Sequence, residues 1–255
     1  MKTHGADGWT RAFYETPALA AVLVEEGELL DQALACLTRE LGLRGGERLL
    51  DQCCGAGGIA LALAERGHPV VGVDISAPFV ERARARAAAR GLPCTFARAD
   101  ATRWQADAPC DAGFNWATGF GCFADDAANQ AMLARAAASL RPDAPFLLDY
   151  YNVAGVLADF KPSFTYAREV DGRAVEVTRA STLDLARGLL HQRWRLVDGD
   201  AVAEPPPTTT RLYLAADLVR LLEGAGFAVE RVLGDADGGA LDLASPRCVV
   251  VARRR

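Results

Sequence analysis

The stretch Leu49-Leu50-Asp51-Gln52-Cys53-Cys54-Gly55-Ala56-Gly57-Gly58 decides how the rest of this chain is interpreted. Its first residues are apolar and run into the acidic Asp51, which is typical of a short buried strand. The glycines that follow predict a tight turn before a helix expected over residues 59–64. Because glycine has no Cβ, the backbone of such a turn can approach a bound ligand closely.

Apolar strand patterns and helical patterns alternate on both sides of this stretch. Beyond the strand at 48–51, the expected strands cover residues 69–74, 94–97, 111–116 and 146–150, and the expected helices cover roughly 78–90 and 125–140. Such alternation predicts an α/β, doubly wound, mostly parallel sheet with helices on both faces. From about 160 to 210 the pattern becomes short alternating segments, which predict a small antiparallel β insertion.

The N-terminal part of the chain is expected to be helical. Thr16-Pro17 predicts the start of an amphipathic helical region that Gly27 divides. We therefore expect an N-terminal helical lid segment over residues 1–44 and a Rossmann-like domain over residues 45–255, with the insertion inside it.

Composition excludes several classes of function. The net charge of −5 disfavours a nucleic-acid partner, and no apolar stretch is long enough to cross a membrane, which predicts a cytoplasmic protein. The 7 cysteines form no C-x-x-C pair and the chain has only 3 histidines, so no metal site is expected.

Two carboxylates flank the glycine turn in the expected sheet. Asp74 ends the second strand, where a carboxylate can accept hydrogen bonds from both hydroxyls of a ribose. Residues 55–60 also match the dinucleotide fingerprint G-x-G-x-x-A, so two nucleoside ligands compete. Asp51 would repel a pyrophosphate but can hold an ammonium group. A ligand with a nucleoside at one end and an amino acid at the other therefore fits better than NAD(P).

Several motifs in order resemble the class I S-adenosylmethionine-dependent methyltransferases, over roughly residues 45–255. Asp51 to Gly57 resembles the motif D-x-G-x-G-x-G, with Cys53 in place of the first glycine. Residues 140–143 resemble the motif L-x-P-G-G, without its glycines. The resemblance implies a seven-stranded sheet with an antiparallel last strand, and S-adenosylmethionine as cofactor. It also implies a set of cofactor-binding residues: Asp51, Cys53, Gly55, Gly57, Asp74, Ile75, Asp100, Ala101 and Asn115.

The methyl acceptor is expected to be a small molecule, natural-product intermediates among them, methylated on O, N or C. Whether a general base is used stays open, and the candidates for a catalytic residue are Tyr14, Tyr151 and His191. The candidates for substrate binding lie at strand ends and after the insertion: Trp116, Phe120, Tyr150, Asn152, Arg211 and Tyr213. Two alternatives remain, an NAD(P)-dependent oxidoreductase and a non-catalytic nucleoside-binding protein on the same fold. Both a monomer and a homodimer are compatible with the sequence.

Overall fold

A computed structural model describes residues 7–23, 27–170 and 172–255 of the chain. Its larger sheet has seven strands in the order β11-β12-β5-β4-β1-β2-β3, and in it β12 alone runs antiparallel to its neighbours. These strands are β1 (Leu49–Gln52), β2 (Val70–Asp74), β3 (Cys94–Arg98), β4 (Ala112–Asn115), β5 (Pro145–Tyr151), β11 (Phe227–Leu233) and β12 (Arg247–Arg254). This arrangement confirms the predicted doubly wound, mostly parallel seven-stranded sheet.

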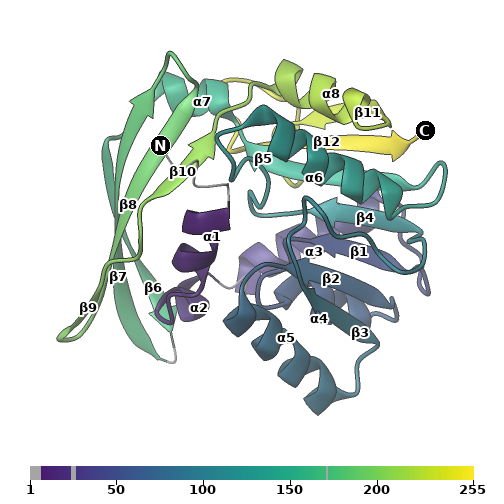
Figure 1. The fold of residues 1–255 in the computed structure, drawn as a ribbon, viewed down its shortest axis with the longest axis horizontal. Helices are drawn as coiled ribbons and strands as arrows, with labels where there is room; N and C mark the ends of the chain where they lie inside the picture. Colours follow the sequence, from purple (N-terminus) through teal and green to yellow (C-terminus); the bar gives the residue numbers. More distant parts are fainter. Residues whose placement is uncertain (1–6, 24–26, 171) are drawn as a thin grey trace.

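Helices cover both faces of this sheet, and each face has its own hydrophobic core (Figure 1). One face packs on α3 (Gly27–Glu40), α4 (Gly58–Glu65) and α5 (Ala77–Arg90). The other face packs mainly on α6 (Asp126–Ala138) and α8 (Ala215–Gly224). Consecutive residues such as Leu49 and Leu50 point into opposite cores, which explains why the strands are apolar throughout.

The antiparallel insertion forms a separate five-stranded sheet. Its strands follow the short helix α7 (Val153–Ala158), and they are β6 (Ser163–Val170), β7 (Arg173–Asp184), β8 (Leu189–Asp198), β9 (Ala201–Ala203) and β10 (Thr208–Arg211). The strand order is β10-β8-β7-β6, with β9 paired to β8. Figure 1 shows this sheet standing apart from the larger one, with α1 and α2 between them. We call the side that packs against α1 and α2 the inner face of the insertion sheet.

The N-terminal helices differ from the sequence-based expectation. A helix, α1 (Asp7–Tyr14), lies before Thr16-Pro17, where we expected the helical region to begin, and α2 (Leu19–Val22) is a single turn. Phe13 of α1 is buried against Trp194 of β8, with the ring centroids 5.5 Å apart. Helices this short depend on tertiary packing, which local sequence patterns do not reveal. Residues 1–6 and 24–26 of the expected lid segment lie outside the described residues.

Candidate cofactor and acceptor site

The loop between β1 and α4 bends through left-handed backbone conformations. Cys53, Gly55 and Gly57 have φ values of 66°, 51° and 75°. Cys53 therefore keeps the conformation that favours glycine at the motif position where the family has glycine. A Cβ on Gly57 would lie 3.0 Å from atoms of both Ala83 and Phe96, so a side chain at this position would crowd both neighbours.

The carboxylate of Asp74 is anchored at the end of the neighbouring strand β2. Its Oδ2 accepts a hydrogen bond from the backbone N–H of Gly55 at 2.9 Å, and its Oδ1 accepts one from Ser76 at 2.8 Å. Burial raises the pKa of Asp74 against the lowering effect of these donors. These donors fix the orientation of the carboxylate at the strand end, where its remaining acceptor capacity suits ribose hydroxyls.

A buried acceptor without a partner lies at the end of β4. Asn115 is fully buried, and its Oδ1 has no hydrogen-bond partner among the described residues. Its Nδ2 donates to Gln52 Oε1 at 3.2 Å, which fixes the amide orientation. Asp51 is also buried, 4% exposed, two strand positions before Cys53. An orphaned amide oxygen and a buried carboxylate beside a glycine loop suit the ammonium end of S-adenosylmethionine, so these residues fit that cofactor.

A buried ion pair supports the strained turn that follows β4. Ala117 and Thr118 have φ values of 57° and 61°, which are unfavourable for residues with a Cβ. Asp149 of β5 accepts a hydrogen bond from the Ala117 N–H at 2.8 Å, and Arg247 of β12 donates to Thr118 Oγ1 at 2.9 Å. Arg247 Nε also donates to Asp149 at 2.7 Å. Sequence patterns did not predict this pair, and its one indication was the charged Asp149 inside an otherwise apolar strand.

Tyr14, at the end of α1, covers the edge of the larger sheet. Ser76 Oγ donates a hydrogen bond to the Tyr14 carbonyl oxygen at 2.9 Å, next to Asp74. Burial is the main influence on the pKa of the Tyr14 hydroxyl, and the charges of neighbouring groups add to it. These groups are Cys122, Asp74, Tyr151 and Cys53. Burial raises the pKa of Tyr14 far above its ordinary value, so the hydroxyl stays protonated and can donate a hydrogen bond.

The thiols near Tyr14 are neutral as well. Burial raises the pKa of Cys122 to about 12 and that of Cys53 well above the usual value. Neutral sulfur and phenol groups therefore accompany the carboxylate of Asp74 near the Tyr14 hydroxyl. Such surroundings favour a reaction in which positive charge leaves the sulfonium.

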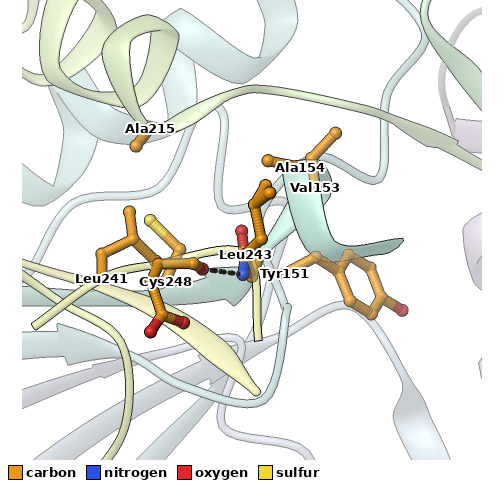
Figure 2. Close-up of a pocket in the computed structure, with 9 residues that line it drawn as sticks. Tyr151, Val153, Ala154, Ala215, Leu241, Leu243 and Cys248 are labelled. Carbon is orange, nitrogen blue, oxygen red and sulfur yellow. Dashed lines mark hydrogen bonds between the residues drawn. The ribbon is translucent and has the colours of Figure 1, made fainter. Parts of the chain in front are cut away.

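Tyr151, at the end of β5, lines a pocket. The pocket has a volume of about 260 Å³ and is lined in part by Tyr151, Leu241 and Cys248. Figure 2 shows the Tyr151 hydroxyl pointing away from the side chains of Leu241 and Cys248.

Most of the expected substrate-binding residues have packing or hydrogen-bonding roles. Phe120, Tyr150 and Tyr213 belong to the buried core on the α6 side of the larger sheet. The Tyr150 hydroxyl donates to the backbone oxygen of Arg211, and the Arg211 guanidinium pairs with Asp126 at 2.9 Å. The Tyr213 hydroxyl donates a hydrogen bond to Asp126, and the Asn152 side chain donates to the backbone oxygens of residues 242 and 245. Trp116 packs against the core on the α4 side.

The other expected site residues lie after strands β2 and β3 of the larger sheet and on strand β8 of the insertion sheet. Asp100 follows β3 and accepts hydrogen bonds from Thr102, while Ala101 is buried next to it and Ile75 directly follows Asp74. His191 lies on β8, where its Nδ1 is 2.9 Å from Thr209 Oγ1. Side chains alternate along a strand, and Gln192 and Trp194 point to the inner face, so His191 points to the outer one.

Comparisons with known proteins agree with this geometry. Residues 49–143 match the family model described as a methyltransferase domain. The chain is 42% identical over 92 residues to the 23S rRNA (uracil(1939)-C(5))-methyltransferase RlmD of Alkalilimnicola ehrlichii, covering 36% of this chain and 18% of that protein. The chain thus spans about a fifth of the length of this relative.

Solved structures resemble nearly the whole chain. The CcbJ methyltransferase from Streptomyces caelestis superposes with a TM-score of 0.81 at 20% identity, over 96% of this chain and 98% of the other. CalS10 from Micromonospora echinaspora, an amino pentose methyltransferase, gives a TM-score of 0.67 at 18% identity, over 93% and 95%.

The fold and the family match point to the same class of protein. The chain has the class I fold of S-adenosylmethionine-dependent methyltransferases, and residues 49–143 match the model of a methyltransferase domain. The expected class of enzyme and the expected cofactor agree with this match and with the similar structures, two of which are described with S-adenosylmethionine bound. Among the residues that the structure describes, no helix is long and apolar enough to span a membrane.

Proposed function

We propose that this protein transfers the methyl group of S-adenosylmethionine to an amine nitrogen of a small molecule. The observation that carries the proposal is the position of Tyr14 at the end of α1, where its carbonyl oxygen accepts a hydrogen bond from Ser76, two residues after Asp74. Figure 1 shows α1 lying between the larger sheet and the insertion sheet, so an acceptor that binds beside Tyr14 would have protein on both sides. Such a position suits a small acceptor better than a folded RNA.

The chain's own residues have distinct tasks in this proposal. Bound S-adenosylmethionine supplies an activated methyl group on its sulfonium. The protein therefore has to orient the acceptor, enclose it and exclude water. Asp74 would hold the ribose and Asn115 the aminoacyl end, while Tyr14 would donate a hydrogen bond to the acceptor. Because the groups around Tyr14 are protonated or engaged, an acceptor that needs no deprotonation fits them best. A neutral amine can attack the methyl group with its lone pair as the S–C bond breaks to leave the thioether, and the methylated ammonium then loses its proton to solvent. An alcohol must lose its proton before it can attack.

The known relatives support the proposal in different ways. CalS10 is described as an amino pentose methyltransferase and KedS8 as a sugar N-methyltransferase, and both resemble this chain over most of its length. The RlmD relatives act on rRNA, but their similarity covers about a third of this chain. With 33 acidic against 28 basic residues, the chain lacks the positive charge that a polyanionic substrate favours. A cytoplasmic location belongs to the same proposal.

The first experiment separates the possible cofactors. We expect S-adenosylhomocysteine to raise the melting temperature of the protein and NADPH to leave it unchanged, because Asp51 repels a pyrophosphate. Stabilisation by NADPH alone would instead support an oxidoreductase.

The second experiment identifies the acceptor class. The protein is incubated with S-adenosylmethionine labelled in the methyl group, once with a pool of small amines and alcohols and once with ribosomal RNA. We expect label on an amine of the small-molecule pool, detected by mass spectrometry, and none with Asp74→Ala. Label on the RNA alone would contradict the proposal, and binding without transfer to either pool would support a non-catalytic protein.

A further inference from the structure

The inner face of the insertion sheet carries an arginine enclosed by aromatic rings. The Cζ atom of Arg179, on β7, lies 5.7 Å from the ring centroid of Phe164, 5.3 Å from that of Tyr166 and 5.2 Å from that of Trp194. Phe164 and Tyr166 come from β6, and Trp194 pairs directly with Arg179 across β7 and β8. We call Arg179 and these three rings the arginine cage.

Two hydrogen-bond donors in the arginine cage are buried and unused. Arg179 Nε and Trp194 Nε1 are both shielded from solvent and have no acceptor among the residues that the structure describes. No carboxylate in that part of the chain pairs with Arg179, although other arginines of the same sheet form ion pairs, such as Arg173 with Asp198 at 3.0 Å. Cation–π contacts stabilise the charge of a guanidinium, but they do not replace the acceptor oxygens that its N–H groups need.

The arginine cage is connected to the proposed reaction site, and its edge at Phe164 is exposed to solvent. Phe13 of α1 contacts Trp194 at 5.5 Å and Tyr14 at 5.0 Å between ring centroids, so one helix touches both places. On the other side, Phe164 lies on the edge strand β6 and is 47% exposed. A ligand can therefore reach the cage from the β6 edge and lie next to α1.

We propose that the arginine cage binds a carboxylate of the methyl acceptor, with Arg179 and Trp194 as hydrogen-bond donors. This inference rests on the proposed function, because it assigns the acceptor class as amines that also carry a carboxylate on or near a planar group. A guanidinium and an indole N–H both donate to carboxylate oxygens, and the flat walls of the cage suit a planar substituent. Arg179 is a binding residue here, distant from the methyl group that reacts.

The test uses benzoate as the probe and benzamide as its uncharged counterpart, with binding to the full chain measured by NMR titration. We expect benzoate to bind and benzamide to bind at least about tenfold more weakly, because the amide lacks the charge that pairs with Arg179. Arg179→Gln should lower benzoate affinity at least about tenfold and Trp194→Phe by about threefold to tenfold. Arg193→Gln is the matched control, because Arg193 is exposed on the other face of β8 and should leave affinity unchanged.

Several outcomes would overturn the inference. Benzoate affinity that is the same in Arg179→Gln and wild type, equal binding of benzamide, or no benzoate binding to the wild type would each do so. Circular dichroism and S-adenosylhomocysteine binding verify that each variant is folded. If Arg179→Gln unfolds, Arg179→Lys retains a charge but not the Nε donor and should still bind at least about threefold more weakly. Failure of S-adenosylhomocysteine to bind the wild type would reject the proposed function and leave the benzoate result to be judged separately.

Discussion

The two sheets of this protein present ligand-facing groups in different ways. At the edge of the larger sheet, the site is defined by backbone conformation and by a carboxylate at a strand end. These features restrict which residue types can occupy particular positions between Asp51 and Asp74. On the insertion sheet, Arg179 meets Trp194 only because β7 and β8 pair in a particular register. A site made by local backbone leaves a motif, whereas a site made by strand register leaves none.

The largest expected effect concerns the ion pair that supports the larger sheet's edge. Asp149→Ala leaves the Arg247 guanidinium half-buried without its partner and frees the strained turn at Ala117 and Thr118. We expect a loss of about 3–5 kcal/mol in the free energy of unfolding, because breaking a buried pair strands a charge. Urea denaturation measures this loss.

The control for that variant is an exposed ion pair at the same sheet. Asp107→Ala removes the partner of Arg48, 2.8 Å away on the surface, and should cost less than about 1 kcal/mol. Equal losses in the two variants would show that the turn after β4 does not depend on Asp149.

A second prediction tests why cysteine is tolerated at the first glycine of the motif. A Cβ on Gly119 would lie 2.6 Å from Cys53 Cβ and 3.0 Å from Asn115 Oδ1. Gly119→Ala should therefore lower the free energy of unfolding by about 1–3 kcal/mol through overpacking.

The double variant Gly119→Ala with Cys53→Gly makes the second prediction specific. Removing the Cys53 side chain removes its clash, so most of the lost stability should return, as measured by a double-mutant cycle in urea. Simple additivity of the two single changes would mean that Gly119 and Cys53 do not compensate each other.

A third prediction concerns cofactor affinity at the larger sheet. Asp74→Ala should weaken S-adenosylhomocysteine binding by about 1–3 kcal/mol, or about fivefold to 150-fold in Kd, because a buried charged acceptor is lost. Isothermal titration calorimetry measures the change, and Arg179→Gln is the control from the other sheet. Unchanged affinity in a folded Asp74→Ala protein would remove the ribose assignment.

The pKa of Asp74 gives this third effect a pH dependence. Burial raises the pKa of Asp74 in the free protein, and ribose hydroxyls that donate to the carboxylate would lower it. Affinity should therefore be full above the pKa of the free protein and fall as the pH drops through it, by at most about tenfold per pH unit. Asp74→Asn should bind more weakly and show no such fall, and calorimetry from neutral to acidic pH compares the two.

The sequence predicted the larger sheet well for a physical reason. Strands buried on both faces must be apolar throughout, and such runs are easy to recognise in a sequence. Cys53 and Asp143 each replace a glycine of a family motif, and both keep a left-handed backbone conformation, with φ values of 66° and 68°. Those two positions were recognised as deviations, but their conformations were visible only in the structure. The roles assigned to the cofactor-binding residues remain predictions.

The acceptor side was much less predictable. Tyr14 was proposed from its place near the N-terminus, yet the helix that holds it depends on the contact of Phe13 with β8. Tyr150 and Tyr213 were chosen as aromatic residues near strand ends, and both lie in the core. Nothing in the sequence distinguished Trp194, in the arginine cage, from an ordinary core aromatic, because its contacts come from strands β6 and β7.

The smallest expected effect compares the two faces of the insertion sheet directly. His191 points to the outer face, and Gln192, one residue later, points to the inner face, where its Nε2 donates to Ser181 Oγ at 3.1 Å. His191→Ala should leave methyl transfer within about twofold of the wild type, as is usual for a side chain outside the site. Gln192→Ala should raise the KM for the acceptor more than that, because it disturbs the face that lies under α1. Steady-state kinetics with the acceptor found by labelling measures kcat and KM for both variants. A loss of kcat in His191→Ala alone would instead identify His191 as the base and assign the catalytic role to the outer face.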